Sequence, residues 1–180
     1  LPAVVAVNRA AVEDLKRETK RALELTHPHV VRIYDFLRTD DNAGISMEYV
    51  DGDTLANLRV DRPGHCFDVS DIRDWVRQLC EALDYAHNKA RVVHRDLKPA
   101  NLMVNRQGDL KVADFGIARS LSDSVSRVTQ RGRTTSGTLA YMSPQQLDGE
   151  APNVSDDIYA LGATIYELLT GKPPFHGGMI

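Results

Sequence analysis

The 180-residue sequence has little cysteine and no excess of basic charge. Its two cysteines, Cys66 and Cys80, fit neither a disulfide framework nor a metal-ligand spacing, and this favours a reducing compartment. Its 22 basic residues against 25 acidic ones do not supply the concentrated positive charge that binding to a phosphate backbone requires. Nucleic acid is therefore not an expected partner.

Long apolar runs are absent as well. No stretch approaches the roughly 18 consecutive apolar residues of a membrane helix, and the start lacks a charged region followed by an apolar signal core. We expect a cytoplasmic chain, with any membrane attachment supplied by segments outside it. The length and the 42% hydrophobic content fit one globular domain, and a start at Leu1 in place of Met suggests that residues precede it.

The pattern of apolar residues predicts helices and short strands in one chain. Apolar residues recur at helical spacing over residues 12–25 and 71–89, which predicts two helices. Residues 155–170 are apolar almost all round, which predicts a buried helix, and a short helix is expected at residues 54–59. Ser70 is the candidate N-cap of the second long helix, and the break at residues 51–53 precedes the short one.

Strands are predicted where short β-rich runs alternate with turn residues. Residues 30–37 and 43–50 flank the turn-forming residues 39–42 and predict an antiparallel hairpin. Three further short strands are predicted at residues 90–93, 102–105 and 110–113. Residues 119–137 are rich in Ser, Thr, Arg and Gly without periodicity, which is typical of a long surface loop or of a disordered linker.

Two motifs carry the chemistry. The segment His94-Arg95-Asp96-Leu97-Lys98-Pro99-Ala100-Asn101 fits the H-R-D-x-x-x-x-N pattern, and Asp114-Phe115-Gly116 follows it. A single Asp or Asn here would be a turn residue at a strand end. Five fixed positions at fixed spacing arise by chance at about one in millions of starting points, so the combination indicates a site.

On these motifs, residues 12–178 resemble the protein kinase family, and most of all the bacterial serine/threonine kinases that share the eukaryotic-type fold. The resemblance implies an α+β, bilobal kinase fold. Residues 1–50 would form a partial N-lobe with helix C, the hairpin and the hinge, and residues 51–180 a mostly helical C-lobe truncated at its C-terminal end. It also implies ATP, Mg²⁺ or Mn²⁺, and a protein substrate with a Ser or Thr acceptor.

The resemblance implies a role for four polar residues of the two motifs. Asp96 would accept or orient the proton of the substrate hydroxyl, and Lys98 would pair with the γ-phosphate. Asn101 and Asp114 would hold the metal ions that bridge the phosphates. A lysine two residues after the aspartate is also the serine/threonine version of this loop.

The nucleotide would lie between the lobes. Glu48 and Val50 would bond adenine through their backbone groups, with Met47 as gatekeeper and Met103 as the apolar floor. Glu18 would pair with the ATP-orienting lysine of a preceding strand. Without the resemblance, Glu18 is one more solvated carboxylate and both methionines are ordinary core residues.

Two further residues have an expected structural role near the site. His94 would pack against Phe115 and take no part in acid–base chemistry. Asp157, in the first turn of the last predicted helix, would tether the backbone of the catalytic loop. It could equally be a first-turn carboxylate that the helix dipole favours.

Control by phosphorylation is expected from Arg95, which directly precedes the catalytic aspartate. Thr134 and Thr135 lie just before Gly137, where kinases of this kind place a regulatory phosphate, and a phosphothreonine there could pair with Arg95. The alternative is that both threonines are ordinary loop residues and that Arg95 caps local carbonyls.

The sequence departs from the family in three places. It contains no glycine-rich phosphate loop and no strand lysine before Glu18, so we expect little or no activity from the 180 residues alone. Gln145 replaces the glutamate of the usual Ala-Pro-Glu triplet, which weakens an expected ion pair. The rival hypotheses are a kinase-shaped scaffold without catalysis and a small-molecule phosphotransferase.

Overall fold

The computed structural model describes residues 23–38, 43–115 and 139–174, and the account below concerns these residues. The predicted helix over residues 12–25 falls almost wholly outside them, as does Glu18. The predicted loop 119–137, with Thr134 and Thr135, lies outside them too. Among the described residues, no helix is both long enough and apolar enough to cross a membrane.

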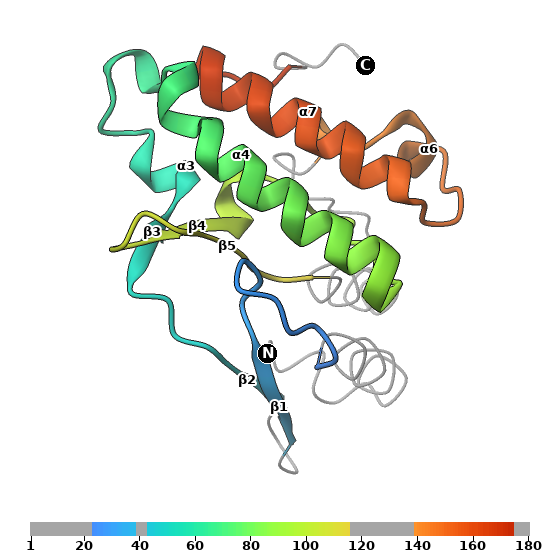
Figure 1. The fold of residues 1–180 in the computed structure, drawn as a ribbon. Helices are drawn as coiled ribbons and strands as arrows, with labels where there is room; N and C mark the ends of the chain where they lie inside the picture. Colours follow the sequence, from blue (N-terminus) through green and yellow to red (C-terminus); the bar gives the residue numbers. More distant parts are fainter. Residues whose placement is uncertain (1–22, 39–42, 116–138, 175–180) are drawn as a thin grey trace.

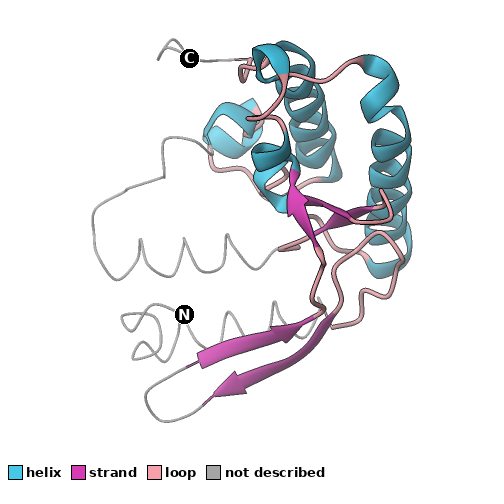
Figure 2. Cartoon of the chain, turned by 90° about the vertical axis from the view of Figure 1, so that its left-hand side faces the viewer, coloured by secondary structure: helices cyan, strands magenta, loops and turns pink. Residues whose placement is uncertain are grey.

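Two small antiparallel sheets carry the strands (Figure 2). Strands β1 (Ile33–Arg38) and β2 (Ala43–Met47) pair with Phe36 opposite Ile45, which confirms the predicted hairpin. The second sheet has the order β3 (Gly52–Thr54), β4 (Leu102–Asn105) and β5 (Leu110–Val112). The predicted strands at 102–105 and 110–113 are therefore confirmed.

Strand β3 corrects the prediction of a simple break at residues 51–53. Gly52 pairs with Asn105 of β4, and the two backbones are so close that a Cβ at position 52 would lie 2.0 Å from the carbonyl oxygen of Val104. Glycine is what permits this approach. The same residue type that indicated a turn therefore allows a short strand to form.

The predicted strand at residues 90–93 is wrong. Tyr85–Ala90 form a π-helical turn, η2, which ends at Arg91 in the left-handed region with φ of 59°. The N–H of Val92 then donates to the carbonyl of Ala86 at 2.9 Å. Arg91 and Val92 thus cap the C-terminal end of this helix instead of pairing with a strand. The β-branched residues of the segment did not reveal this.

Two long helices, α4 (Val69–Asp84) and α7 (Val154–Thr170), lie side by side (Figure 1). Helix α4 begins one residue before Ser70, with Asp68 as its N-cap, which corrects the predicted cap. The carboxylate of Asp71 accepts the N–H of Asp68 at 3.4 Å. Helix α7 agrees with its prediction and ends at Gly171, in the left-handed region with φ of 76°.

Short helical turns connect these elements. Thr54 caps α3 (Leu55–Leu58) by accepting the N–H of Asn57, which confirms the short predicted helix. The remaining turns are α6 (Pro144–Leu147), η1 (Pro63–His65), η3 (Pro99–Asn101) and η4 (Leu139–Tyr141).

The core lies where α4 faces the second sheet and α7. Its most deeply buried members come from all three, and they include Leu79, Ala82, Leu83, Leu102, Leu110, Val112 and Leu168. Within this apolar contact, the buried side chain of Gln78 accepts the N–H of Leu110 at 2.7 Å and donates to Asp109. The β4–β5 hairpin is thereby fixed on α4, and residues 94–101 are placed next to it and to α7.

Candidate active site

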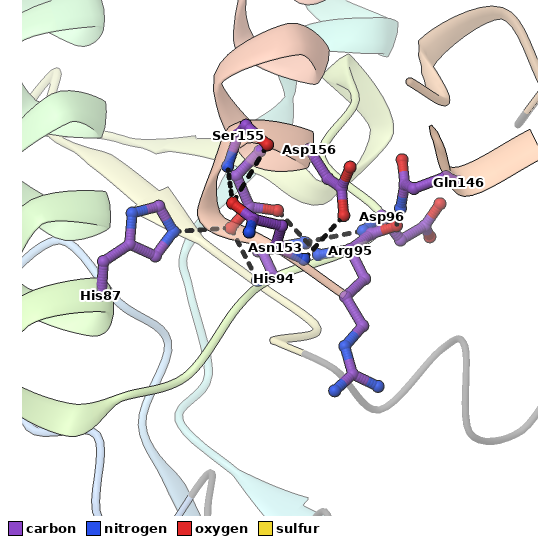
Figure 3. A network of polar contacts seen from close by, with 9 residues as sticks. His87, His94, Arg95, Asp96, Gln146, Asn153, Ser155 and Asp156 are labelled. Carbon is purple, nitrogen blue, oxygen red and sulfur yellow. Dashed lines mark hydrogen bonds and ion pairs between the residues drawn. The ribbon is translucent and has the colours of Figure 1, made fainter. Parts of the chain in front are cut away.

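The segment 94–96 is anchored by a buried carboxylate at the start of α7. Asp157 accepts the N–H groups of His94 and Arg95, each at 2.8 Å, and lies 2.7 Å from Nε2 of His87. Figure 3 shows His87, His94 and Arg95 close to the first turn of α7. The expected tether between Asp157 and the backbone of the loop is confirmed.

The charge of Asp157 is stabilised in this position. Burial by itself would raise the pKa of the carboxyl group, but the hydrogen bonds from His87, Arg95 and His94 outweigh it, so the pKa lies below its usual value. Asp157 is therefore ionised at neutral pH, and its charge-assisted bonds to the loop are strong ones.

His94 is completely buried and joins the two motifs. Its ring lies 4.6 Å from the ring of Phe115, measured between centroids, which confirms the expected packing. Its Nδ1 accepts the N–H of Asp96 at 3.2 Å, so Nε2 carries the proton that is donated to the carbonyl of Ala113 at 2.9 Å. Both ring nitrogens are used in holding backbone, which leaves none for acid–base chemistry.

Asp96, Lys98 and Asn101 form one polar cluster. The Nζ of Lys98 lies 3.0 and 2.8 Å from the two carboxylate oxygens of Asp96. The side-chain amide of Asn101 donates to the carbonyl and to the carboxylate of Asp96, at 2.7 and 3.0 Å. Because the amide nitrogen faces Asp96, the amide oxygen of Asn101 faces away from it and can accept or coordinate.

Asp114 is placed beside this cluster by the backbone. The N–H of Ala113 donates to the carbonyl of Asn101 at 2.9 Å, and Asp114 follows in the left-handed region with φ of 61°. Burial raises the pKa of Asp114, and the charge of Asp96 raises it further, while His94 and Lys98 oppose the shift. The carboxylate therefore lacks a sufficient counter-charge among the described groups around it.

The donor atoms at this point fit a magnesium ion. Among the described residues, no group of three or more His, Cys, Asp and Glu side chains could hold a metal by itself. Asp114 and Asn101 instead offer one carboxylate and one amide oxygen, and Mg²⁺ is commonly bound by one or two protein oxygens together with water and substrate phosphates. A cation would also supply the counter-charge that Asp114 lacks.

The residues expected at the hinge lie at the end of β2 and just after it, and the residue expected at the adenine floor lies on β4. Met47 ends β2 with its side chain exposed, Val50 is buried, and Met103 is half-buried on β4. The carboxylate of Glu48 lies 2.6 Å from Nζ of Lys111. Met103 and Lys111 are partners across β4 and β5, so Lys111 connects Glu48 to the strand that carries Met103.

A buried charged group near the end of α7 was missed in the sequence. Glu167 is buried, lies 2.6 Å from the guanidinium of Arg59 and accepts the hydroxyl of Tyr141. Arg59 also donates to the carbonyl of Gly171 at 2.9 Å. Burial and the carboxylate of Glu167 together raise the pKa of Tyr141. A glutamate in an otherwise apolar helix was the only signal available in the sequence.

Residues 143–146 are tied to the catalytic loop. Gln146 is buried and donates to the carbonyl of Arg95 at 3.3 Å, and Ser143 donates to Asp156 at 2.5 Å. Gln145, where the family pattern has glutamate, is exposed. Figure 3 shows Gln146 beside Arg95 and Asp96. Gln146, the neighbour of the residue that differs from the family pattern, therefore makes the contact with the loop.

The sequence and the fold are similar to those of known protein kinases. The protein kinase domain model matches residues 4–179. Serine/threonine-protein kinase PknB of Mycobacterium leprae is 42% identical over 167 residues, and PknB of Mycolicibacterium smegmatis is 41% identical over 167 residues; each alignment covers 90% of this chain and 26% of the relative. The crystal structure of the Mycobacterium tuberculosis PknI kinase domain matches with a TM-score of 0.76 at 30% identity, over 97% of this chain and 63% of that one.

The chain thus spans about a quarter of the length of these curated relatives. The similarity to a solved kinase domain confirms the predicted α+β kinase fold. Protein kinases use ATP and divalent metal ions, and the oxygen donors of Asn101 and Asp114 are compatible with that chemistry. Since the family model covers nearly all of the sequence, the chain belongs to the protein kinase domain family.

Proposed function

We propose that the full-length protein transfers the γ-phosphate of ATP to serine and threonine hydroxyls of protein substrates. The observation that carries this proposal is the cluster of Asp96, Lys98 and Asn101 beside Asp114, in which one carboxylate is held by an ammonium group and by an amide. The names of the similar bacterial proteins, serine/threonine-protein kinases, support the choice of acceptor.

The residues of the cluster would act by position and charge. Phosphoryl transfer has a loose transition state, so an enzyme mainly aligns the acceptor hydroxyl and stabilises charge. Asp96 would accept the hydrogen bond of the acceptor hydroxyl and take its proton. Lys98, 2.8 Å from Asp96 in the structure, would lie close enough to contact a γ-phosphate oxygen at the same point.

Asn101 and Asp114 would hold Mg²⁺, with Mn²⁺ as the alternative, through the amide oxygen and the carboxylate. A bound divalent cation neutralises negative charge on the ATP phosphates. The chain's own contribution is to keep both oxygen donors oriented. The amide of Asn101 is fixed by Asp96, and the backbone of Asp114 is fixed through Ala113.

The adenine ring would lie between residues 1–50, as partial N-lobe and hinge, and residues 51–180, as partial C-lobe. Backbone groups of Glu48 and Val50 would bond its edge, Met47 would be the gatekeeper and Met103 the floor. Glu18 would pair with an ATP-orienting lysine. The half-buried position of Met103 next to the strand that leads to Asp114 supports this arrangement.

A substrate panel tests the proposal. We expect the full-length protein, with ATP and Mg²⁺, to phosphorylate peptides that offer Ser or Thr and not matched peptides that offer Tyr, sugars or aminoglycosides. Transfer to small molecules alone would replace the proposal with a small-molecule phosphotransferase. Binding of ATP without transfer to any acceptor would indicate a kinase-shaped scaffold.

Regulation is proposed at Arg95. Its Nε is buried and has no hydrogen-bond partner among the described residues, while its backbone is fixed by Asp157 and by Gln146 with φ of 71°. A buried donor without a partner costs stability unless an acceptor reaches it. A phosphate on Thr134 or Thr135 would supply charged acceptor oxygens to this guanidinium.

We predict that the active full-length protein carries phosphate on Thr134 or Thr135, which mass spectrometry can detect. The double variant Thr134→Ala, Thr135→Ala is expected to lose most activity, because Arg95 then has no phosphate to bind. The matched control is Ser122→Ala, Ser124→Ala, earlier in the same segment, which should keep activity. A fully active protein without modification anywhere in residues 120–138 would remove the switch.

A further inference from the structure

An ion pair connects the hinge to the strand that precedes Asp114. The Nζ of Lys111 on β5 lies 2.6 Å from Oε1 of Glu48, and Oε2 of Glu48 accepts the N–H of Arg32 at 3.1 Å. The side chains of Lys111 and Glu48 are only 17% and 26% exposed. Both carboxylate oxygens are thus occupied, and water competes with the pair less than it does at the surface.

The same two elements are also joined through the backbone of residues 29–32. On one side of this segment, the N–H of Val112 donates to the carbonyl of His29 and the N–H of Val31 donates to the carbonyl of Val112, at 2.9 and 2.8 Å. On the other side, the N–H of Glu48 donates to the carbonyl of Arg32 at 2.7 Å. The ion pair therefore closes a ring of contacts between the hinge and β5.

The charges of the pair are present at neutral pH. Burial alone would raise the pKa of Glu48, but the hydrogen bond and the charge of Lys111, with the N–H of Arg32, outweigh it and lower the pKa. The carboxylate of Glu48 is therefore ionised at neutral pH. Breaking the pair leaves one half-buried charge without its partner, and that costs more than losing a surface pair.

Lys111 also lies between two parts of the proposed nucleotide site. It is the cross-strand partner of Met103, the proposed adenine floor, and it precedes Asp114 by three residues on the same chain segment. A single nucleotide must reach the hinge with its adenine and Asp114 with its metal-bound phosphates. The distance between hinge and β5 therefore affects how well a single molecule fits both.

We propose that Lys111 is a positioning residue for ATP, because its ion pair with Glu48 sets the place of the hinge backbone relative to Met103 and Asp114. This inference rests on the proposed function. Lys111 touches neither the reacting phosphate nor the acceptor. The contacts that it supports are equal in the ground state and in the transition state, so its loss weakens ATP binding and leaves the chemical step unchanged.

The test uses steady-state kinetics of the full-length protein. We expect Lys111→Met to raise the KM for ATP about three- to tenfold, with kcat within about twofold of wild type. Glu48→Gln, which keeps an acceptor for the N–H of Arg32, should have a similar effect. The double variant should be no worse than the poorer single one, since both remove one interaction. Lys111→Arg keeps the positive charge, so this variant should have the wild-type KM for ATP.

The matched control is a second ion pair that joins the segment after the hinge to the β4–β5 turn. Arg106 lies 3.0 Å from Asp51, with side chains 77% and 54% exposed. Arg106→Met removes a cation of comparable position but leaves Glu48 and Lys111 in place. We expect an unchanged KM for ATP, because an exposed pair contributes little. Thermal unfolding of every variant separates effects on the stability of the fold from effects on the KM for ATP.

The outcomes distinguish the two proposals. If the wild-type protein neither binds a fluorescent adenine nucleotide with Mg²⁺ nor phosphorylates peptides, the proposed function is wrong. If it does both and Lys111→Met keeps the wild-type KM, the inference is wrong. It is also wrong if Arg106→Met raises KM equally, or if the effects of Glu48→Gln and Lys111→Met multiply. Should Lys111→Met fail to fold, Glu48→Gln and Lys111→Arg decide the question.

Discussion

If the proposed function holds, Asp96→Asn and Asp114→Asn are each expected to lower the turnover of the full-length protein by about 100-fold or more. Asp96→Asn removes the carboxylate that would accept the hydroxyl proton and that holds Lys98 at 2.8 Å. Asp114→Asn removes the only carboxylate in the proposed metal pair with Asn101. Both changes keep the size of the side chain, so the loss concerns charge and position and not packing.

The two variants should differ in stability. Because the pKa of Asp114 is raised in the folded state, the folded protein holds that proton more tightly than the unfolded chain does. The ionised carboxylate therefore costs stability at neutral pH, and this cost vanishes below the unfolded pKa of about 4. Asp114→Asn removes the cost, and asparagine tolerates the left-handed φ of 61° at this position.

We therefore expect Asp114→Asn to melt at or above the wild-type temperature at pH 7 without metal, with the difference lost near pH 4. Added Mg²⁺ should stabilise the wild type and not this variant. Asp96→Asn serves as the comparison, since it has no such expected gain. Near-normal turnover in either variant, with unchanged melting, would remove its assigned role, and a lower melting temperature for Asp114→Asn at pH 7 would contradict the electrostatic account.

The second large effect is expected at Asp157. Asp157→Ala leaves the buried N–H of His94, the N–H of Arg95 and the ring of His87 without their acceptor. Losing one partner of a buried charged network costs about 3–5 kcal/mol of unfolding free energy. Because the same bonds hold the catalytic loop, activity should fall together with stability.

Urea unfolding measures the loss of stability, and hydrogen exchange at the amides of His94 and Arg95 shows whether the loop has been released. Asp156→Ala is the control, because this neighbouring carboxylate bonds Ser143 and caps α7 through Asn153 without touching the loop. It should cost about 1–2 kcal/mol and leave exchange at His94 slow. Slow exchange in Asp157→Ala as well would show that the tether is not what orders the loop.

The charge of Asp157 also makes the stability of the fold depend on pH in the acid range. Its pKa is lowered in the folded state, so its stabilisation is complete above the unfolded value of about 4 and is lost as the pH falls toward the folded value. This is opposite in sign to Asp114. The two carboxylates therefore separate in a pH titration of stability, which Asp157→Asn and Asp114→Asn would resolve.

Local patterns predicted much of the fold. The hairpin of β1 and β2 and helix α7 agree with the sequence because each is set by residues close together in the chain: a turn between two β-rich runs, and an apolar run ended by Gly171. Strand β3 was missed because Gly52 is a turn residue locally, and its partner Asn105 lies on a distant part of the chain.

In the candidate site, too, local motifs were predicted and contacts between distant residues were missed. The spacing of the two motifs indicated Asp96, Lys98 and Asn101, and the structure brings them together with Asp114 beside them. The side-chain role of Glu48 was not predicted, because the resemblance concerned its backbone and nothing near it in sequence indicated Lys111. The contact of Arg59 with Glu167 was missed for a similar reason, since periodicity cannot reveal a polar pair between distant parts of the chain.

Residues 139–147 are attached to the body of the domain at both ends. Tyr141 bonds the buried Glu167, and Ser143 and Gln146 bond Asp156 and the carbonyl of Arg95. Substitution of Tyr141, Ser143 or Gln146 would break one of these contacts, so these three positions tolerate little change. Pro144, Gln145 and Leu147 are exposed, so a protein engineer could vary this surface there while leaving those contacts in place.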